Sequence, residues 1–350
     1  METQRTGERA LAQVLFVLPT DVLVAAGFDA SAALLRLVSR AVRDALASRP
    51  HPLPVAFFPS ALADIARQYP VTRLRPTREK TAAAYAATMA NFAAALPFLG
   101  SLSILDLSAL RLDEALAPGF PAFDARAFYA DLQTHCPRLR FVLFGQLAMH
   151  VHGDADGGPD VADADVAHVA AWVASTVPRP AHAHHTRRPT LRKHVLEVLR
   201  FDYLRLKEEE AHVLLLASLA TPTVHILSFA GNGMYRLRVL MRDAAARATG
   251  LRKLDLSWNY FGGFYHSDLT DNAKKSAADL AALVTDMPSL CALSLKHNRL
   301  TDTDGAALAA ALARHTHLTT LDLRDNDGLS PEMHLALRAA WAGPAEKLLL

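Results

Sequence analysis

Histidine and aspartate side chains that could hold a metal ion gather in two places. Imidazole and carboxylate groups alternate along one segment, formed by His150, His152, Asp154 and Asp156, and three more histidines, His182, His184 and His185, crowd a segment flanked by prolines. Asp154-x-Asp156 begins like a calcium-binding loop, but that motif requires glycine at its sixth position, where Pro159 stands. The alternating histidines lack a well-spaced second set of ligands. We therefore predict no metal site and no cofactor.

Nucleophilic catalysis finds little support either. The only cysteines, Cys136 and Cys291, have no evident histidine partner. The sequence contains no glycine-rich phosphate loop with lysine, no nucleophile elbow and no His–Glu metal motif. Two cysteines cannot form a disulfide framework, which favours a reducing compartment. We expect a protein that is not an enzyme.

Aromatic residues offer a different chemistry, that of protein recognition. Five of them fall within a short segment of a chain that is only 7% aromatic: Trp258, Tyr260, Phe261, Phe264 and Tyr265. Exposed Trp and Tyr are favoured at the energetic centres of protein interfaces. We predict that all but Phe261, which fits a core position, bind a protein partner. The alternative is a loop that folds back over local apolar surface.

Length and composition bound the kind of molecule that carries these residues. At about 150 residues per domain, 350 residues suggest two domains or one elongated one. A content of 51% hydrophobic residues excludes a disordered chain, and a net charge of +2 gives no basis for nucleic-acid binding. The apolar stretch 14–28 is interrupted by Pro19 and Asp21, so no membrane segment is predicted. We expect a cytoplasmic protein, with the nucleus as the alternative location.

One pattern recurs through the C-terminal third and organises the fold. Leu251-x-x-Leu254-x-Leu256-x-x-Asn259 has counterparts that start at 224, 290 and 318, at nearly even spacing except for the longer step from 251 to 290. The alternating leucines predict a short strand with one buried face. The Ala-rich segments between, such as 304–315, predict helices. Such units cannot bury their apolar faces alone and must stack, in layers filled by Leu, Val and Ala.

These motifs resemble leucine-rich repeats of the ribonuclease-inhibitor-like type. The resemblance implies an α/β solenoid over 51–350, a curved horseshoe with parallel strands on the concave side and helices on the convex side. Repeats are clear over 196–350 and degenerate over 71–195, where the stretch 139–196 spans about two repeat periods and leaves room for an additional unit. Strand alternation predicts a concave partner-binding row, formed by Lys253, Asp255, Ser294, Lys296, Asp322 and Arg324. The longer step from 251 to 290 predicts an insertion that carries the aromatic cluster.

Residues 1–50 lie outside the repeats and are predicted to form a small helical unit. Segment 15–48 resembles an F-box, and the resemblance implies that an Skp-type adaptor binds through Leu18, Pro19, Leu35 and Val38. The hypothesis is a non-catalytic interaction module, with substrate recognition for a cullin–RING ubiquitin ligase as its specific form. The alternatives are a plain scaffold with a helical cap, or a GTPase-activating protein of the Ran type that uses Arg324.

Overall fold

The computed structural model describes the chain from residue 53 onward, with gaps. The described ranges are 53–56, 62–68, 71–75, 82–108, 125–145, 162–175, 195–206, 208–235, 248–262, 269–287, 289–314 and 317–350. Apart from Leu53, these belong to one compact unit, Pro54–Leu350. The predicted helical unit at 1–50 and its adaptor-binding residues Leu18, Pro19, Leu35 and Val38 lie outside the described residues and stay predictions. No helix in these ranges is long and apolar enough to cross a membrane.

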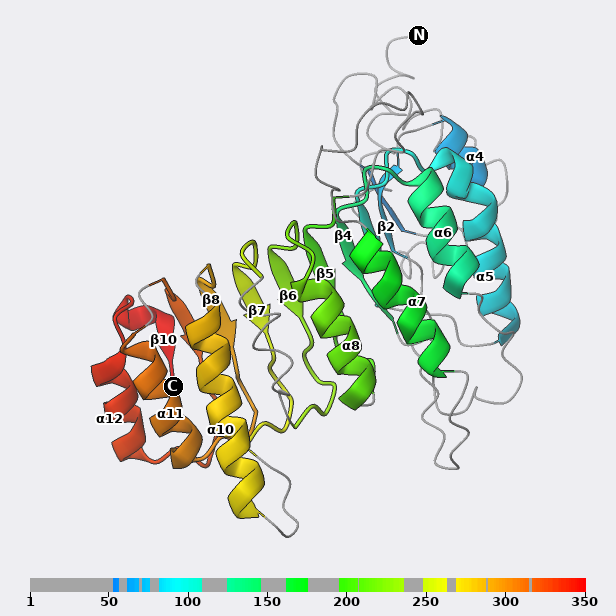
Figure 1. Ribbon diagram of the computed structural model, residues 1–350. Coiled ribbons are helices and arrows are strands. Elements are labelled where there is room, and N and C mark those ends of the chain that lie inside the picture. The colour runs from blue at the N-terminus through cyan, green and yellow to red at the C-terminus, as the bar shows by residue number, and fades with distance from the viewer. Residues whose placement is uncertain are drawn as a thin grey trace, which may run out of the picture. The chain divides into compact units, whose positions relative to one another are not determined.

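The strands form one ten-stranded sheet in which spatial order follows sequence order, from β1 to β10 (Figure 1). The pairings from β2 to β10 are all parallel. The bounds are β1 Leu53–Ala56, β2 Val71–Arg75, β3 Ile104–Asp106, β4 Phe141–Leu143, β5 Val198–Arg200, β6 Ile226–Ser228, β7 Lys253–Asp255, β8 Ala292–Ser294, β9 Thr320–Asp322 and β10 Leu348–Leu349. Each repeat thus contributes one short strand at its recurring leucines.

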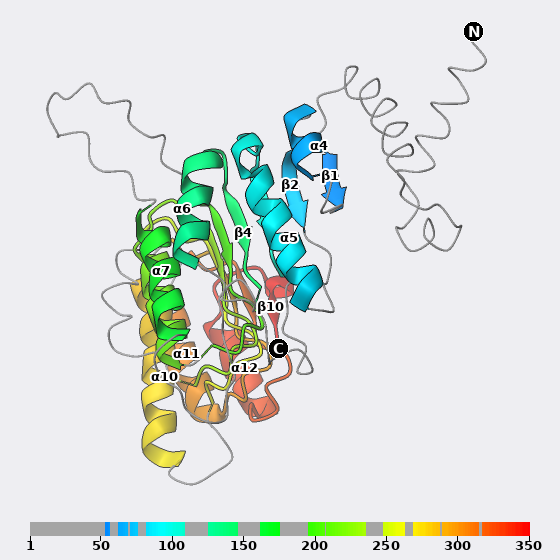
Figure 2. The same ribbon diagram turned by 90° about the vertical axis from the view of Figure 1, so that its right-hand side faces the viewer.

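The helices lie on one side of the sheet and leave the other face open (Figures 1 and 2). Their bounds are α4 Leu62–Gln68, α5 Ala82–Ala95, α6 Ala125–His135, α7 Ala162–Ser175, α8 Glu208–Leu219, α10 Leu269–Asp286, α11 Asp302–Leu312 and α12 Pro331–Ala340. Neighbours such as α10 and α11 pack side by side. The helix predicted at 304–315 begins slightly earlier, at Asp302, because Thr301 and Asp304 form a capping box in which the Thr301 amide donates to Asp304 Oδ2 at 2.9 Å.

The core lies between the sheet and the helices, and its composition changes along the solenoid. Leu254, Leu293 and Leu321 are buried opposite one another on β7, β8 and β9. The expectation that Leu, Val and Ala fill every layer is wrong further back. There, three phenylalanines occupy the sixth position of successive repeats, with ring centroids 4.4 Å apart for Phe144 and Phe201 and 4.8 Å apart for Phe201 and Phe229. Such offset aromatic stacking stabilises the layers beyond the effect of burial alone.

An asparagine ladder joins the turns that follow the strands. The buried carbonyl Oδ1 of Asn259 accepts hydrogen bonds from the backbone amides of Asn232 and Met234 in the preceding repeat, at 3.1 and 3.0 Å. Its amide group donates to the carbonyl oxygens of Phe229 and Leu256, at 3.0 and 2.8 Å. Asn232 and Asn326 bind the repeats before them in the same way. The asparagines therefore satisfy backbone groups that the short strands leave unpaired.

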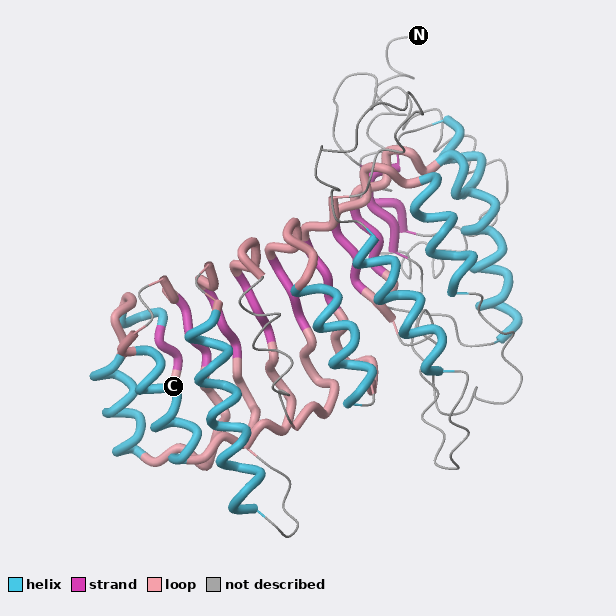
Figure 3. The backbone as a smooth tube through the Cα atoms, in the orientation of Figure 1, coloured by secondary structure: helices cyan, strands magenta, loops and turns pink. Residues whose placement is uncertain are grey.

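Two details of the degenerate region differ from the predicted arrangement. An additional unit between 139 and 196 is excluded, because β4 pairs directly with β5 through Val142 and Leu199. That stretch therefore holds one long repeat. In addition, β1 lies before residue 71, where the first degenerate repeat is predicted, so the sheet begins one repeat earlier than predicted. Figure 3 shows the succession of strand, loop and helix in several repeats, for example from β5 to α8 and from β8 to α11. The predicted fold class, an α/β leucine-rich-repeat solenoid, is confirmed.

The two cysteines sit in contrasting environments, which predicts selective alkylation. Cys136 is buried, and burial raises its thiol pKa to about 12, whereas Cys291 is partly exposed. Because the thiolate is the reactive species, iodoacetamide should modify Cys291 and spare Cys136 in the folded protein. Mass spectrometry would show one adduct per native chain, none in Cys291→Ser, and two after unfolding in guanidinium. Equal labelling rates for both thiols would contradict the burial of Cys136.

Candidate functional site

The turns after β5, β6, β7, β8 and β9 each place a residue in the left-handed backbone region immediately before the asparagine position. These residues are Tyr203, Gly231, Trp258, His297 and Asp325, with φ between 54° and 68°. Glycine adopts such angles without strain, whereas every other residue type is uncommon there. Four of the five repeats therefore place a large or charged side chain at a position where glycine would be conformationally easier. These four side chains are therefore presented at the turns in a backbone conformation that favours glycine.

The side chains of this row touch one another across the repeats. The Trp258 and His297 rings stack, with centroids 3.9 Å apart. The Tyr203 ring covers Gly231 so closely that a Cβ there would lie 2.2 Å from Tyr203 Cδ1. Tyr203 and Trp258 nevertheless remain 42% and 43% exposed. The row is thus an ordered aromatic surface.

A second row lies two positions further along each turn and widens this surface. The Arg299 guanidinium lies 4.5 Å from the centroid of the Tyr260 ring, within the range of a cation–π contact. Tyr235 follows in the loop after β6 and is 39% exposed. Members of the two rows, together with Tyr235, form a surface that we call the aromatic edge: Tyr203, Tyr235, Trp258, Tyr260, His297 and Arg299.

The open face of the sheet adjoins the aromatic edge and carries mixed charge. Strand register aligns Asp255, Ser294 and Asp322 in one row, with Lys253 in the row beside it. Lys296 Nζ contacts Asp325 Oδ2 at 3.1 Å, which joins the open face to the row of left-handed turn residues. The predicted orientation of the strands is therefore correct, and Leu254, Leu293 and Leu321 face inward.

Most charges on the open face already have partners within the chain. Arg324 Nε and Nη2 donate to the Asp322 carboxylate at 2.9 and 2.7 Å, and Ser257 Oγ donates to Asp255 Oδ1 at 2.6 Å. Partial burial works to raise the pKa of Asp322, but the hydrogen bonds from Arg324 outweigh it and hold that pKa below its usual value. This face thus offers a partner oriented polar groups without a strong field of one sign.

Asp202 follows β5 and lies on the same open face, in an earlier repeat than Asp255 and Asp322. Its carboxylate is largely buried. Burial raises its pKa, against the hydrogen bonds it accepts from Ser228 Oγ at 2.5 Å and the Ala230 amide at 3.1 Å. The register also aligns Val198 and Ile226 on this part of the sheet. The open face is therefore more apolar toward β5 and more polar toward β9.

The predicted site residues fall into three groups. Trp258 and Tyr260 lie on the aromatic edge, and Lys253, Asp255, Ser294, Lys296, Asp322 and Arg324 lie on the open face. Phe264 and Tyr265 are outside the described residues. The expectation that an insertion carries Trp258 and Tyr260 is wrong, because they occupy the same turn positions as His297 and Arg299 in the next repeat. Phe261 is fully buried, as predicted.

Sequence reasoning missed four members of the aromatic edge. Tyr203, Tyr235, His297 and Arg299 are scattered in sequence between positions 203 and 299. Aligning the repeat sequences with one another would have identified two of them, because Tyr203 and His297 occupy the same turn position as Trp258. Within the described ranges, no group of three or more His, Cys, Asp or Glu residues could hold a metal ion; the histidine clusters at 150–156 and 182–185 lie outside them.

A comparison with models of known protein families agrees with the repeat architecture. A family model described as "Leucine Rich repeat" matches residues 314–332, the repeat that contains β9. Among solved structures, the chain is similar to the crystal structure of human trophoblast glycoprotein, also called Wnt-activated inhibitory factor 1, with 22% identity and a TM-score of 0.32. The match covers 65% of this chain and 61% of the other, so it spans less than two thirds of that protein. No curated protein matches the sequence.

Proposed function

We infer that this leucine-rich repeat protein is a non-catalytic scaffold that binds a protein partner through the aromatic edge and the adjoining open face. The observation that carries this proposal is the pair of exposed rings, Tyr203 and Trp258, at left-handed backbone positions, with Trp258 stacked on His297. Rigid Trp and Tyr side chains lose little conformational entropy on binding and supply large contact area. The polar open face beside them would set the orientation of the partner.

The more specific form of the proposal is a substrate-recognition subunit of a cullin–RING ubiquitin ligase. It rests on the F-box resemblance of segment 15–48, in which Leu18, Pro19, Leu35 and Val38 would bind the adaptor. The nearly even repeat starts at 196, 224 and 251 support the ribonuclease-inhibitor-like type. In this form the client would bind the aromatic edge and would also contact Phe264 and Tyr265, and the protein would act in the cytoplasm or nucleus.

Two alternatives remain distinct from the ligase proposal. In a plain scaffold, the N-terminal helices would only cap the first layer of the solenoid. A GTPase-activating protein of the Ran type would need an arginine directed at its GTPase. Arg324 is a weak candidate for that role, because two of its nitrogens already hold the Asp322 carboxylate.

Substitution of Tyr203 and Trp258 by alanine together should abolish most partner binding. Loss of two aromatic hot spots costs about 2–4 kcal/mol or more, which corresponds to roughly a 30-fold to 1,000-fold loss of affinity. Affinity purification from cells, with quantitative mass spectrometry, compares the proteins captured by the two forms. The matched control is Leu335→Ala, which removes a side chain that is 64% exposed on α12.

Capture of the same proteins by the wild-type and double-variant chains would contradict the assignment of the aromatic edge. The captured set also separates the two forms of the proposal. A ligase subunit brings adaptor and cullin with its client and loses only those two in Leu35→Asp. A plain scaffold captures its client without either.

A further inference from the structure

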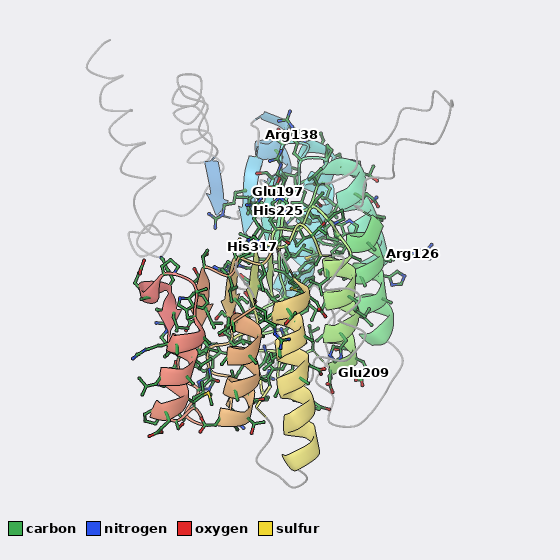
Figure 4. All side chains as sticks on the ribbon, turned by 60° about the vertical axis from the view of Figure 1, so that its left-hand side comes forward. Arg126, Arg138, Glu197, Glu209, His225 and His317 are labelled. Carbon is green, nitrogen blue, oxygen red and sulfur yellow. The ribbon has the colours of Figure 1, made fainter. Side chains whose placement is uncertain are left out.

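A cavity of about 270 Å³ opens at the edge of the sheet where the chain enters the strands, opposite the edge that carries the asparagine ladder. Its lining includes a guanidinium, two imidazoles, two hydroxyls and a thiol, from Arg252, His225, His317, Thr249, Ser289 and Cys291. These residues come from the four successive repeats of β6, β7, β8 and β9. Figure 4 labels His225 and His317, which follow Glu197 along this edge. We call this site the entry cavity.

The repeat geometry explains why these side chains converge. His225, Arg252 and Cys291 each immediately precede a strand. The His225 carbonyl accepts a hydrogen bond from the Arg252 amide at 2.9 Å, and the Arg252 carbonyl accepts one from the Cys291 amide at 2.8 Å. Three residues at the same position of adjacent strands are therefore held at the strand spacing, about 4.8 Å apart. The other three lining residues come from the turns just before these positions.

The described lining is rich in hydrogen-bond donors and contains no carboxylate. Cys291 Sγ and Ser289 Oγ donate to backbone carbonyls, those of Ser289 and Ala248. Within the described ranges, Arg252 has no ion pair or side-chain hydrogen bond, so its guanidinium is available to a ligand. The acidic residue at the same position of the preceding repeat, Glu197, contacts Arg140 Nη1 at 3.3 Å instead. The cavity is therefore positive and suited to an anion.

We propose that the entry cavity binds a phosphomonoester. The planar guanidinium of Arg252 can hold two phosphate oxygens at once, and the His225 imidazole and the Thr249 hydroxyl, which line the same cavity, can donate to the third. The volume of about 270 Å³ lies just below the range of small-molecule pockets, which begins at about 300 Å³. The cavity can therefore hold the phosphate group and the atoms of the ester closest to it. This site is separate from the aromatic edge, and it does not depend on the proposed scaffold function.

Cys291 provides a reporter for occupancy, since it lines the same cavity and is partly exposed. We expect O-phosphoserine and inorganic phosphate to slow the alkylation of Cys291 by iodoacetamide in a saturable way, at constant ionic strength. Arg252→Ala should raise the concentration for half-protection by roughly tenfold or more, and Arg252→Lys should raise it less. The matched control is Arg338→Ala on α12, which should leave protection unchanged. Isothermal titration calorimetry measures the affinity of each ligand independently of Cys291 alkylation.

The outcomes separate clearly. Absence of protection and of heat with both ligands, or protection that survives Arg252→Ala, would overturn the proposal. Equal affinity for O-phosphoserine and for a phosphoserine peptide would indicate a small phosphate ester as the natural ligand. Much tighter binding of the peptide would indicate a phosphorylated protein segment. Circular dichroism of each variant verifies that the chain is folded.

Discussion

Asn259→Ala is expected to lower the free energy of unfolding by about 4 kcal/mol, because two buried backbone amides lose their acceptor at a cost of about 1–3 kcal/mol each. These are the amides of Asn232 and Met234, which have Asn259 Oδ1 as their partner. The Asn259 side chain is fully buried, so water cannot replace it without opening the turn. Urea denaturation followed by circular dichroism measures the loss.

Asn298→Ala provides the matched comparison within the same ladder. The Asn298 amide donates to the Leu256 carbonyl at 2.9 Å, but its Oδ1 accepts no hydrogen bond from the part of the chain that the structure describes. Because no described amide depends on Asn298 Oδ1, the substitution removes only the bonds that the side chain donates. We therefore expect the free energy of unfolding to fall by only about 1 kcal/mol. Asn326→Ala should behave like Asn259→Ala, since Asn326 Oδ1 accepts from the amides of Asn298 and Leu300. Equal losses at all three positions would show that the ladder does not act through these amides.

Gly262→Ala is expected to destabilise the fold by about 3 kcal/mol or more, because it forces two neighbouring repeats apart. A Cβ at Gly262 would lie 1.7 Å from the carbonyl oxygen of Arg299, and no side-chain rotation can relieve a clash with backbone. The Gly262 amide also donates to the Asn298 carbonyl at 3.0 Å, and this bond would lengthen. Thermal and urea denaturation measure the change.

Gly100→Ala is the control for Gly262→Ala. A Cβ at Gly100 would meet only the His135 carbonyl oxygen, at 3.9 Å, which is an ordinary contact. Its expected effect is within about 1 kcal/mol, of either sign. Because Arg299 contacts Tyr260 on the aromatic edge, Gly262→Ala should also weaken partner binding. A variant with full stability and full binding would show that the repeats can separate at this point without cost.

Much of the fold is predictable from local patterns. The leucines and asparagines at fixed spacing identify four repeats, and they correctly place β6, β7, β8 and β9. The prediction is weaker where Leu204 replaces the asparagine, because the motif then loses its most specific residue. The supposed additional unit between β4 and β5 shows the limit: chain length alone cannot distinguish two repeats from one long repeat. The direct pairing of Val142 with Leu199 decides it.

The candidate site is only partly predictable. Trp258 and Tyr260 stand out because aromatic residues cluster locally in sequence. Tyr203 and His297 do not, since each is a single aromatic or imidazole side chain in its own repeat. Stacking of the repeats brings Trp258 and His297 to 3.9 Å between ring centroids, although they belong to different repeats. The entry cavity was not predictable for the same reason, because its six side chains come from four repeats.

The periodic unit of this protein can be read from its residues alone: a short strand, a turn with asparagine, and a helix, repeated. This is possible because strand alternation and helix propensity depend on neighbours along the chain. The folded arrangement was needed to show which repeats are adjacent, which turns stack, and where rings and cationic groups meet. Those contacts form between residues one repeat or more apart, and they depend on the register between strands. The aromatic edge and the entry cavity are therefore properties of the stacked solenoid, at opposite edges of one sheet.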